Sequence, residues 1–585
     1  MVDSKKIIQR RSVDLSISKF QTDLPPVLQR IYASRGITDD AELQLRLTEL
    51  CKPESLRGLT TAIDILVDAF QTQKRILIIG DFDADGATSC ALSILALKAM
   101  GIHSVDYLVP NRFEYGYGLT PEIVAVAAGK KPDILITVDN GISSIEGVAA
   151  AQERGMKVIV TDHHLPGDKL PSAEAIVNPN QGQCDFPSKN LAGVGVIFYV
   201  MTSLRTALRE ISWFEDNAIS EPNMANYLDL VALGTVADVV PLDYNNRVLV
   251  HQGLQRIRSR KARPGIIALL DVAGRRPENI VATDLGFVVG PRLNASGRLD
   301  DISLGIQCLL CDSIDLAREM ALELDGLNKD RKAIESGMQQ EAVHSLEKIQ
   351  LEDNHELPWG LCLYDENWHQ GVIGILASRI KDRVNRPVIA FANADADDSS
   401  EIKGSARSIE GLHIRDALDE VAAKHPNLLN KFGGHAMAAG LTLPKENFER
   451  FQNAFDDVVK AKLTESDLQA QVLSDGELAQ DELSLVLAET LRNAGPWGQH
   501  FPEPLFDGEF YIVQQRIVGQ KHLKLVVSKE EKGQVIFDAI AFNIDPDQWP
   551  NPDIKKVLLV YKLDVNEFRG RRSLQLMVDY IEPVL

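Results

Sequence analysis

The region from Arg75 to about Val240 alternates between continuous apolar runs and segments with helical spacing, and this alternation limits the folds open to the chain. The buried strands that it predicts are Arg75–Gly80, Asp133–Val138, Met156–Thr161 and the shorter Ala175–Val177. The helices predicted between them are Ser89–Met100, Pro121–Ala128 and Ser144–Arg154. The repeated alternation of strand and helix predicts a parallel α/β sheet. In such sheets, ligands bind beyond the carboxyl ends of the strands.

One long helix is predicted from Ser313 to about Gln350, where apolar residues recur at helical intervals. Ser313 fits the N-cap position. At a rise of about 1.5 Å per residue the helix would be about 55 Å long, which is typical of a connector between two domains. A helical hairpin broken near Gly326 is the alternative interpretation.

Two further regions follow this helix. A second α/β region is predicted from about Leu357 to Leu463, with an acidic loop at Asn393–Glu401 and a glycine-rich turn at Lys431–Gly440. Thr464–Thr490 carries seven acidic residues and no Lys or Arg, which indicates a solvated linker with a helix.

Five short strands after Phe506 predict a small β-barrel at the end of the chain. Basic residues gather in the barrel segment around Tyr561 and Phe568. Basic residues interleaved with aromatic ones are typical of a surface that binds single strands. A merely solvated basic face is the alternative.

The composition argues against a protein that coats nucleic acid uniformly. The chain has 62 Lys and Arg against 83 Asp and Glu, a formal net charge of −21, whereas such proteins are usually basic. A nucleic-acid enzyme stays possible, because the distribution of charge matters more than its sum. Six unpatterned cysteines, a charged N-terminus and the lack of any apolar run of about 18 residues predict a cytoplasmic protein without a membrane segment.

The strongest chemical signal is an acidic cluster that directly follows the first predicted strand. Asp81, Asp83 and Asp85 place three carboxylates within five residues, where they repel one another at neutral pH. Such clusters are typical of calcium loops, solvated turns or sites for other divalent cations. A calcium-hand loop needs a Glu at its twelfth position, where this chain has Leu92. A catalytic metal site at the end of the strand is therefore favoured.

Three more polar pieces follow apolar segments, at Asp139–Gly141, Asp162–His164 and Asp238. Taken singly, Asp139–Gly141 could be a common turn, the histidines of Asp162–His164 could be surface or core residues, and Asp238 could end a helix. Together they place carboxylates and imidazoles along one edge of one sheet. This mixture suits Mn²⁺ better than Ca²⁺, and Mg²⁺ rarely takes histidine. Two ions about 3.5–4 Å apart are the usual clamp for phosphoryl displacement.

The four pieces, in this order, resemble the DHH phosphoesterase superfamily, which is named after the triplet Asp162–His164. Later segments narrow the resemblance to the RecJ family of bacterial single-strand-specific exonucleases, namely Asn294–Asp300, Trp368–Gly374, Gly404–Ser408 and Gly433–Gly440. The resemblance implies an N-terminal helical segment at 1–50, a parallel-sheet DHH catalytic domain at 51–310, a connecting helix at 311–352, an α/β DHHA1 domain at 353–463, and an acidic linker with a small β-barrel (OB-fold) at 464–585.

The resemblance also implies roles for individual residues. The implied metal ligands are Asp81, Asp83, Asp85, Asp139, His163 and Asp238. Asp139 would bridge two ions, and Asp81 would bind either directly or through a neighbouring ligand. His164 would face the scissile phosphate and join Asp83, Asp85, Asp139, His163 and Asp238 in the catalytic set, whereas Asp162 would orient a neighbouring histidine.

The implied substrate-binding residues are Ser296, Arg298, Ser405, Arg407, Gly433, Gly434 and His435. Arg298 would bind the 5′ phosphate, because a guanidinium can take a terminal phosphate with two hydrogen bonds. A salt bridge from Arg298 to Asp300 or Asp301 is the alternative.

The implied activity is 5′-to-3′ degradation of single-stranded DNA to mononucleotides with two Mn²⁺ or Mg²⁺ ions, in DNA recombination and repair. The implied partners are single-stranded DNA, single-stranded-DNA-binding protein and a RecQ-type helicase, and the expected state is a monomer. Two alternatives stay open. One is a phosphodiesterase of the same superfamily for short oligonucleotides or cyclic dinucleotides, and the other is a non-catalytic DNA-binding relative.

Overall fold

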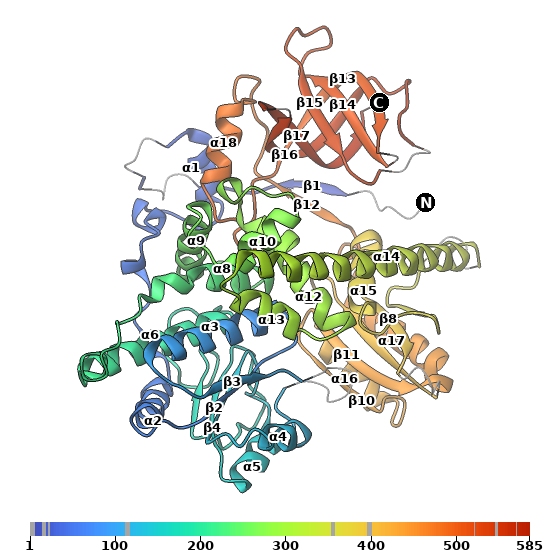
Figure 1. Cartoon of the computed structure of the whole chain (residues 1–585). Helices are drawn as coiled ribbons and strands as arrows, with labels where there is room; N and C mark the ends of the chain where they lie inside the picture. The colour runs from blue at the N-terminus through green and yellow to red at the C-terminus, as the bar shows by residue number, and fades with distance from the viewer. Residues whose placement is uncertain are drawn as a thin grey trace. The chain divides into compact units, whose positions relative to one another are not determined.

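A computed structural model of the chain describes residues 6–14, 19–20, 24–110, 118–352, 357–394, 400–519, 521–544, 548–568 and 570–584. The chain divides into two compact units (Figure 1), each described by itself below. The larger unit comprises Arg10–Gly326 and Ser474–Leu585, and the smaller unit comprises Met1–Gln9 and Leu327–Leu473. Within the described ranges, no helix combines the length and the apolar character needed to span a membrane.

A five-stranded parallel sheet lies in the larger unit. Its strands, in spatial order, are β3 (Val105–Leu108), β2 (Ile76–Ile79), β4 (Ile134–Val138), β5 (Lys157–Thr161) and β6 (Ala175–Val177). The predicted parallel sheet is therefore confirmed. The edge strand β3 was not predicted, because it is only partly buried and carries Asp106 in place of an apolar run.

Helices cover both faces of this sheet, which explains why its central strands are apolar without alternation. One face packs against α2 (Leu59–Gln71), α3 (Ala84–Met100) and α6 (Gly193–Glu210). The other face packs against α4 (Pro121–Ala128) and α5 (Ile145–Glu153), as Figure 1 shows.

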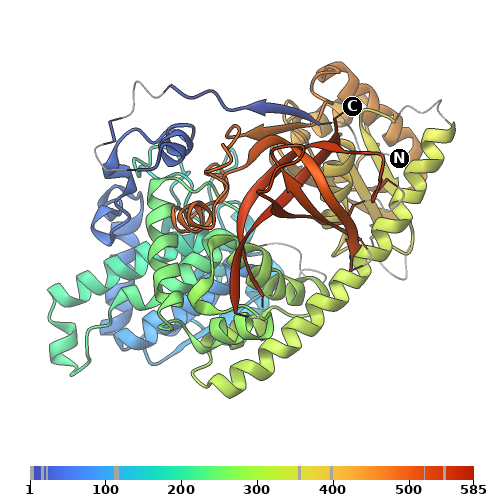
Figure 2. The ribbon, with the colours of Figure 1, turned by 90° about the horizontal axis from the view of Figure 1, so that it is seen from above.

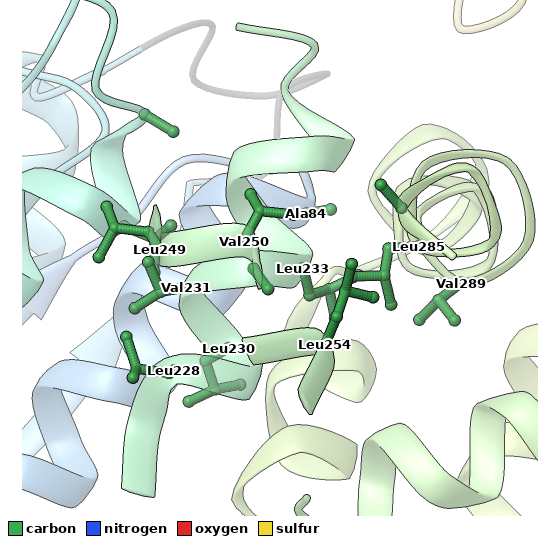
Figure 3. Packing of buried hydrophobic residues seen from close by; sticks show 14 of the residues in the cluster. Ala84, Leu228, Leu230, Val231, Leu233, Leu249, Val250, Leu254, Leu285 and Val289 are labelled. Carbon is green, nitrogen blue, oxygen red and sulfur yellow. The ribbon is translucent and has the colours of Figure 1, made fainter. Parts of the chain in front are cut away.

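A second helical layer packs on α3 and consists of α8 (Leu228–Ala237) and α9 (Tyr244–Arg258). Leu230, Val231 and Leu233 of α8 lie among apolar side chains of α9 (Figure 3). Burial of each such leucine contributes roughly 1.5–3 kcal/mol. The π-helix η7 (Leu285–Val289) and α12 (Gly290–Leu299) continue this layer. The other helices of the unit are α1 (Pro26–Ala33), η2 (Asp40–Leu43), η3 (Leu47–Glu49), η4 (Pro53–Ser55), α7 (Trp213–Asp216), η5 (Met224–Tyr227), α10 (Pro264–Val272), η6 (Pro277–Asn279), α11 (Ala282–Asp284), α13 (Ser303–Leu310) and α18 (Leu485–Asn493).

The smaller unit contains a mixed five-stranded sheet. Its strands, in spatial order, are β10 (Lys431–Gly434), β11 (Ala438–Pro444), β9 (Glu401–Arg407), β8 (Val388–Asn393) and β7 (Leu361–Tyr364), and its helices are α15 (Ile373–Val384), α16 (Ile414–Lys424), η8 (Lys445–Asn447) and α17 (Phe448–Lys462). The glycine-rich segment predicted as a turn forms the hairpin β10–β11, in which Gly433 pairs with Gly440. Residues 395–399 of the predicted acidic loop lie outside the described residues.

The long helix α14 runs without a break from Ile314 to Glu352 (Figure 2). The hairpin alternative near Gly326 is therefore wrong, although the division between the two units falls directly after this glycine. Polar side chains are buried along the helix in both units: Asp325 pairs with Arg292 at 2.7 Å, and Glu335 pairs with Arg331 at 2.6 Å.

The C-terminal strands close into a barrel in the order β13 (Phe506–Val518), β14 (His522–Ser528), β15 (Phe537–Ala541), β17 (Arg571–Pro583) and β16 (Lys556–Phe568), which confirms the predicted barrel. Tyr561 is fully buried and cannot stack on a base. Five of the basic residues form ion pairs with acidic ones, namely Lys524, Lys529, Lys556, Lys562 and Arg572. These contacts favour the solvated-face alternative for this part of the barrel.

The segment predicted as a solvated acidic linker is largely structured. Its strand β12 (Gln471–Ser474) pairs with β1 (Ile7–Arg10). Asp475 follows β12 and accepts two hydrogen bonds from Arg35, at 2.8 and 2.9 Å. Both side chains are only 1% exposed, so this pair ties the N-terminal helical region to the chain that leads into the barrel.

We expect Asp475→Ala to lower the free energy of unfolding by about 3–5 kcal/mol, because it leaves the guanidinium of Arg35 buried without its partner. Asp106→Ala is the matched control, since Asp106 and Lys130 form an exposed pair worth at most about 1 kcal/mol. Denaturant unfolding of both variants measures the difference. Equal effects would show that the buried pair does not join these segments.

Candidate active site

The acidic cluster forms the turn between β2 and α3. Asp83 is the N-cap of α3, and its carboxylate accepts hydrogen bonds from the backbone N–H groups of Asp85 (2.9 Å) and Gly86 (3.0 Å). Gly86 is required for this tight turn, because a Cβ there would lie 2.4 Å from the Asp81 carbonyl oxygen. The first turn of α3 therefore holds the Asp83 carboxylate in place beside Asp81 and Asp85.

Asp85 is buried against the N-terminus of α6. Its two carboxylate oxygens accept hydrogen bonds from the N–H groups of Gly193 (2.6 Å) and Val194 (2.9 Å). These donors stabilise the charge at the positive end of the helix dipole. Burial and the neighbouring charge of Asp238 nevertheless raise the pKa of Asp85 to about 7.

Asp139 follows β4 in a left-handed backbone conformation, with φ of 61°. Its side chain lies so close to α6 that a Cβ on Gly193 would be 2.6 Å from the Asp139 Cβ. The next residue, Asn140, is buried and donates to the carbonyl oxygens of Ile79 (3.0 Å) and Val138 (2.9 Å). These bonds join the ends of β2 and β4 and fix the position of Asp139.

Asp162 is fully buried at the end of β5 and orients both histidines. Its Oδ1 accepts hydrogen bonds from the backbone N–H of His163 (2.7 Å) and from His164 Nδ1 (2.7 Å). Burial opposes the charge of Asp162, but the bond from His164 lowers the pKa of this carboxyl below its usual range. For His164, burial is outweighed by Asp162, which raises the pKa of the imidazole to about 9.

Asp238 lies at the end of a helix and approaches His163 from there. It is the C-cap of α8, so the interpretation of this piece as the end of a helix is confirmed. His163 Nε2 lies 3.4 Å from Asp238 Oδ2 and 3.1 Å from Asp139 Oδ1. Burial lowers the pKa of His163, which leaves it neutral and suited to bind a metal.

The ligand atoms converge in three overlapping groups, each with its atoms within 4.8 Å of one another. The groups are Asp81, Asp83 and Asp139; Asp139, His163 and His164; and Asp85, His163 and Asp238. Asp139 and His163 each belong to two groups. The two oxygens of the Asp139 carboxylate could bridge two adjacent ions, whereas His163 Nε2, with one lone pair, could bind only one of them.

The chemistry of this donor set fits divalent cations. Burial and the neighbouring acids raise the pKa of Asp139 well above its usual value. Burial and the charge of Asp83 likewise raise the pKa of Asp238 to about 7. A divalent cation would offset this repulsion. The carboxylate oxygens suit Mn²⁺ or Mg²⁺, and the imidazole of His163 favours Mn²⁺ of the two.

The helix α12 lies against the acidic cluster. Asn294 Oδ1 accepts a hydrogen bond from Ala84 N at 2.7 Å, and a Cβ on Gly297 would lie 1.9 Å from the Phe82 carbonyl oxygen. Arg298, in the last turn of α12, is therefore beside the cluster. Ser296 is fully buried in this structure, and its hydroxyl donates to the Leu293 carbonyl oxygen.

The other predicted substrate residues lie on neighbouring strands of the smaller unit. Gly440 of β11 pairs with both Ser405 and Gly433, which places these two residues in one row across the sheet. Arg407 Nη1 donates to Ser405 Oγ at 3.1 Å, and a Cβ on Gly374 would lie 2.9 Å from Arg407 Nη2. Gly434 and His435 continue the β10–β11 hairpin, where His435 N donates to the Ala438 carbonyl oxygen at 2.8 Å.

Three supporting groups were not predicted: the Asn294 side chain, Asn140 as a bridge between strands, and the N–H groups at the start of α6. The last has a sequence signal in Gly193 and Gly195, since glycine at a helix start permits close approach of a ligand or side chain. The partners of Asn140 and Asn294 depend on contacts far apart in the chain and leave no local signal.

The chain matches three family models in order: the DHH family N-terminal domain at residues 75–235, the DHHA1 domain at 359–461 and the RecJ OB domain at 474–580. It is 55% identical over 577 residues to the single-stranded-DNA-specific exonuclease RecJ of Salmonella typhimurium, with 99% of each chain covered. The corresponding protein of Haemophilus influenzae is 53% identical over 582 residues, with 99% of this chain and 100% of the relative covered.

Solved structures show the same likeness. The crystal structure of RecJ from Thermus thermophilus in complex with Mn²⁺ has a TM-score of 0.77 and 28% identity, covering 96% of this chain and 76% of that one. Its Mg²⁺ complex has a TM-score of 0.71 and 26% identity over the same shares. The identities, the three domain matches in order and the convergent acidic centre together place the chain in the RecJ family of single-stranded-DNA-specific exonucleases.

Proposed function

We propose that this chain is a metal-dependent exonuclease that degrades single-stranded DNA from the 5′ end to mononucleotides, in DNA recombination and repair. The observation that carries the proposal is the set of overlapping ligand groups that share Asp139 and His163. Two divalent cations in such a set polarise a phosphodiester, lower the pKa of the attacking water and neutralise developing charge. Membership of the RecJ family supports the choice of substrate.

Within this proposal the ligands are Asp81, Asp83, Asp85, Asp139, His163 and Asp238, with Asp139 as the bridge. Asp81 belongs to the same group as Asp83 and Asp139, which supports direct binding. Asp162 holds the His164 ring toward the scissile phosphate. The backbone N–H groups of α6 keep Asp85 in place through the reaction.

Substrate contacts are assigned to both units. Arg298 binds the 5′ phosphate, which is supported by the packing of α12 on the acidic cluster. Ser405, Arg407, Gly433, Gly434 and His435 hold the DNA backbone. Arg407 is partly buried, and desolvation lowers the pKa of its guanidinium. A phosphate bound there would stabilise the charged guanidinium by accepting hydrogen bonds from it.

The chain is proposed to act in the cytoplasm as a monomer. Family analogy supports single-stranded-DNA-binding protein and a RecQ-type helicase as partners. A phosphodiesterase for short substrates and a non-catalytic DNA-binding role are less well supported, because the chain retains every predicted ligand of the centre.

The proposal is tested with single-stranded oligonucleotides labelled at either end, in Mn²⁺ or Mg²⁺. We expect the 5′ label to appear at once as a mononucleotide, while the 3′ label stays on a shrinking ladder. Chelation should stop the reaction and added Mn²⁺ should restore it. Release of mononucleotides from the 3′ end first would refute the polarity, and activity in excess chelator would refute the metal requirement.

We expect Asp139→Asn to lower kcat by more than about a hundredfold, because even outer partners of metal ligands are worth about 10–100-fold. Asparagine tolerates the left-handed φ of 61° at this position, and it removes one charge from the repelling cluster. The melting temperature of the metal-free variant should therefore equal or exceed that of the wild type. Asp168→Asn, at an exposed position, is the control and should change neither. Full activity of a folded Asp139→Asn protein would contradict the ligand assignment.

A further inference from the structure

Phe287 is an exposed aromatic side chain on the π-helix η7, which packs against the last turn of α8. It is 79% exposed, whereas Leu285 and Val289 of the same π-helix are fully buried. Figure 3 shows Leu285 and Val289 turned into the core beside Leu233 and Leu254. The inward anchoring of these two residues leaves the ring of Phe287 between them in solvent.

The π-helix is held against the last turn of α8, directly before Asp238. A Cβ on Gly286 would lie 3.1 Å from Val236 Cγ1, and a Cβ on Gly290 would lie 3.1 Å from the Ala237 Cβ. Glycine at both positions allows this close approach. Phe287 is therefore carried by an element in contact with the two residues that precede a predicted metal ligand.

Val239, directly after Asp238, adds a second exposed apolar group. It is 60% exposed and has a φ of 62°, a conformation that a β-branched residue adopts only under strain. The strained turn orients Asp238 toward His163 and leaves Val239 on the surface. On the other side, the π-helix continues into α12, which packs on the acidic cluster and carries Arg298.

We infer that Phe287, together with Val239, forms the surface on which a nucleobase of the DNA strand stacks next to the scissile phosphate. This inference rests on the proposed exonuclease function. A phenyl ring stacks on any base, which suits an enzyme that must degrade every sequence. A base stacked on this ring is removed from its neighbours in a duplex, so the contact favours unpaired strands.

The test removes the two stacking partners separately and together: the phenyl ring by substitution of Phe287, and the nucleobase by an abasic site in the DNA. Phe287→Ala, Phe287→Tyr and the control Val486→Ala are assayed on single strands that carry one abasic site at successive positions from the 5′ end. Val486 is 72% exposed on α18, which packs beside the barrel, so it is a matched exposed apolar residue. Melting temperatures should stay at the wild-type value, since Phe287 has few buried contacts.

For the intact strand we expect Phe287→Ala to raise KM by roughly tenfold to a hundredfold and Phe287→Tyr to restore it. One abasic position should raise KM for the wild type, for Phe287→Tyr and for Val486→Ala, but have little further effect on Phe287→Ala. An unchanged KM for Phe287→Ala would overturn the stacking site. So would an abasic site that raises the KM of Phe287→Ala by the same factor as it raises the KM of the wild type. If the wild type and Val486→Ala degrade no single strand at all, the proposed function fails before this site is tested.

Discussion

Mutual repulsion of buried carboxylates is the constraint on which the larger unit depends. Asp85 and Asp139 are buried and Asp238 is partly buried, and desolvation together with the charges of neighbouring acids raises the pKa of each carboxyl. Left alone, such groups would separate or take up protons. The fold prevents separation by fixing each group from its own side: Asp85 on the N-terminus of α6, Asp139 at the end of β4, and Asp238 at the end of α8.

The sheet and the helices around it hold these carboxylates together against their repulsion. Parallel strands bring Asp139 and Asp162 to one edge of the sheet, because successive βα units place all carboxyl ends on the same side. Glycine at 193 lets a helix approach Asp139 closely. The left-handed backbone at Asp139 and Val239 costs on the order of 1–3 kcal/mol each, and it persists because the surrounding packing determines it. The strain lies at one proposed ligand, Asp139, and directly after another, Asp238.

Much of the larger unit could be predicted from local sequence. Continuous apolar runs predicted β2, β4, β5 and β6, and the acidic and histidine motifs predicted which residues would converge. The failures share a physical cause, since each depends on tertiary contacts. The strand β3 is half-exposed. The glycine-rich segment is a hairpin whose second strand, β11, pairs with both β10 and β9. Asp475 is buried against Arg35, which lies far away in the chain. The exposure of Phe287 is likewise set by two buried neighbours in a π-helix, a geometry that apolar spacing does not reveal.

The carboxylates and His163 are proposed to form one centre for two ions, with Asp139 between them. Anomalous diffraction from crystals soaked in Mn²⁺ tests this proposal most directly. Two manganese peaks about 3.5–4 Å apart are expected, with Asp139 contacting both ions and His163 contacting at least one. A single peak, or two peaks that share no contact with Asp139, would contradict it.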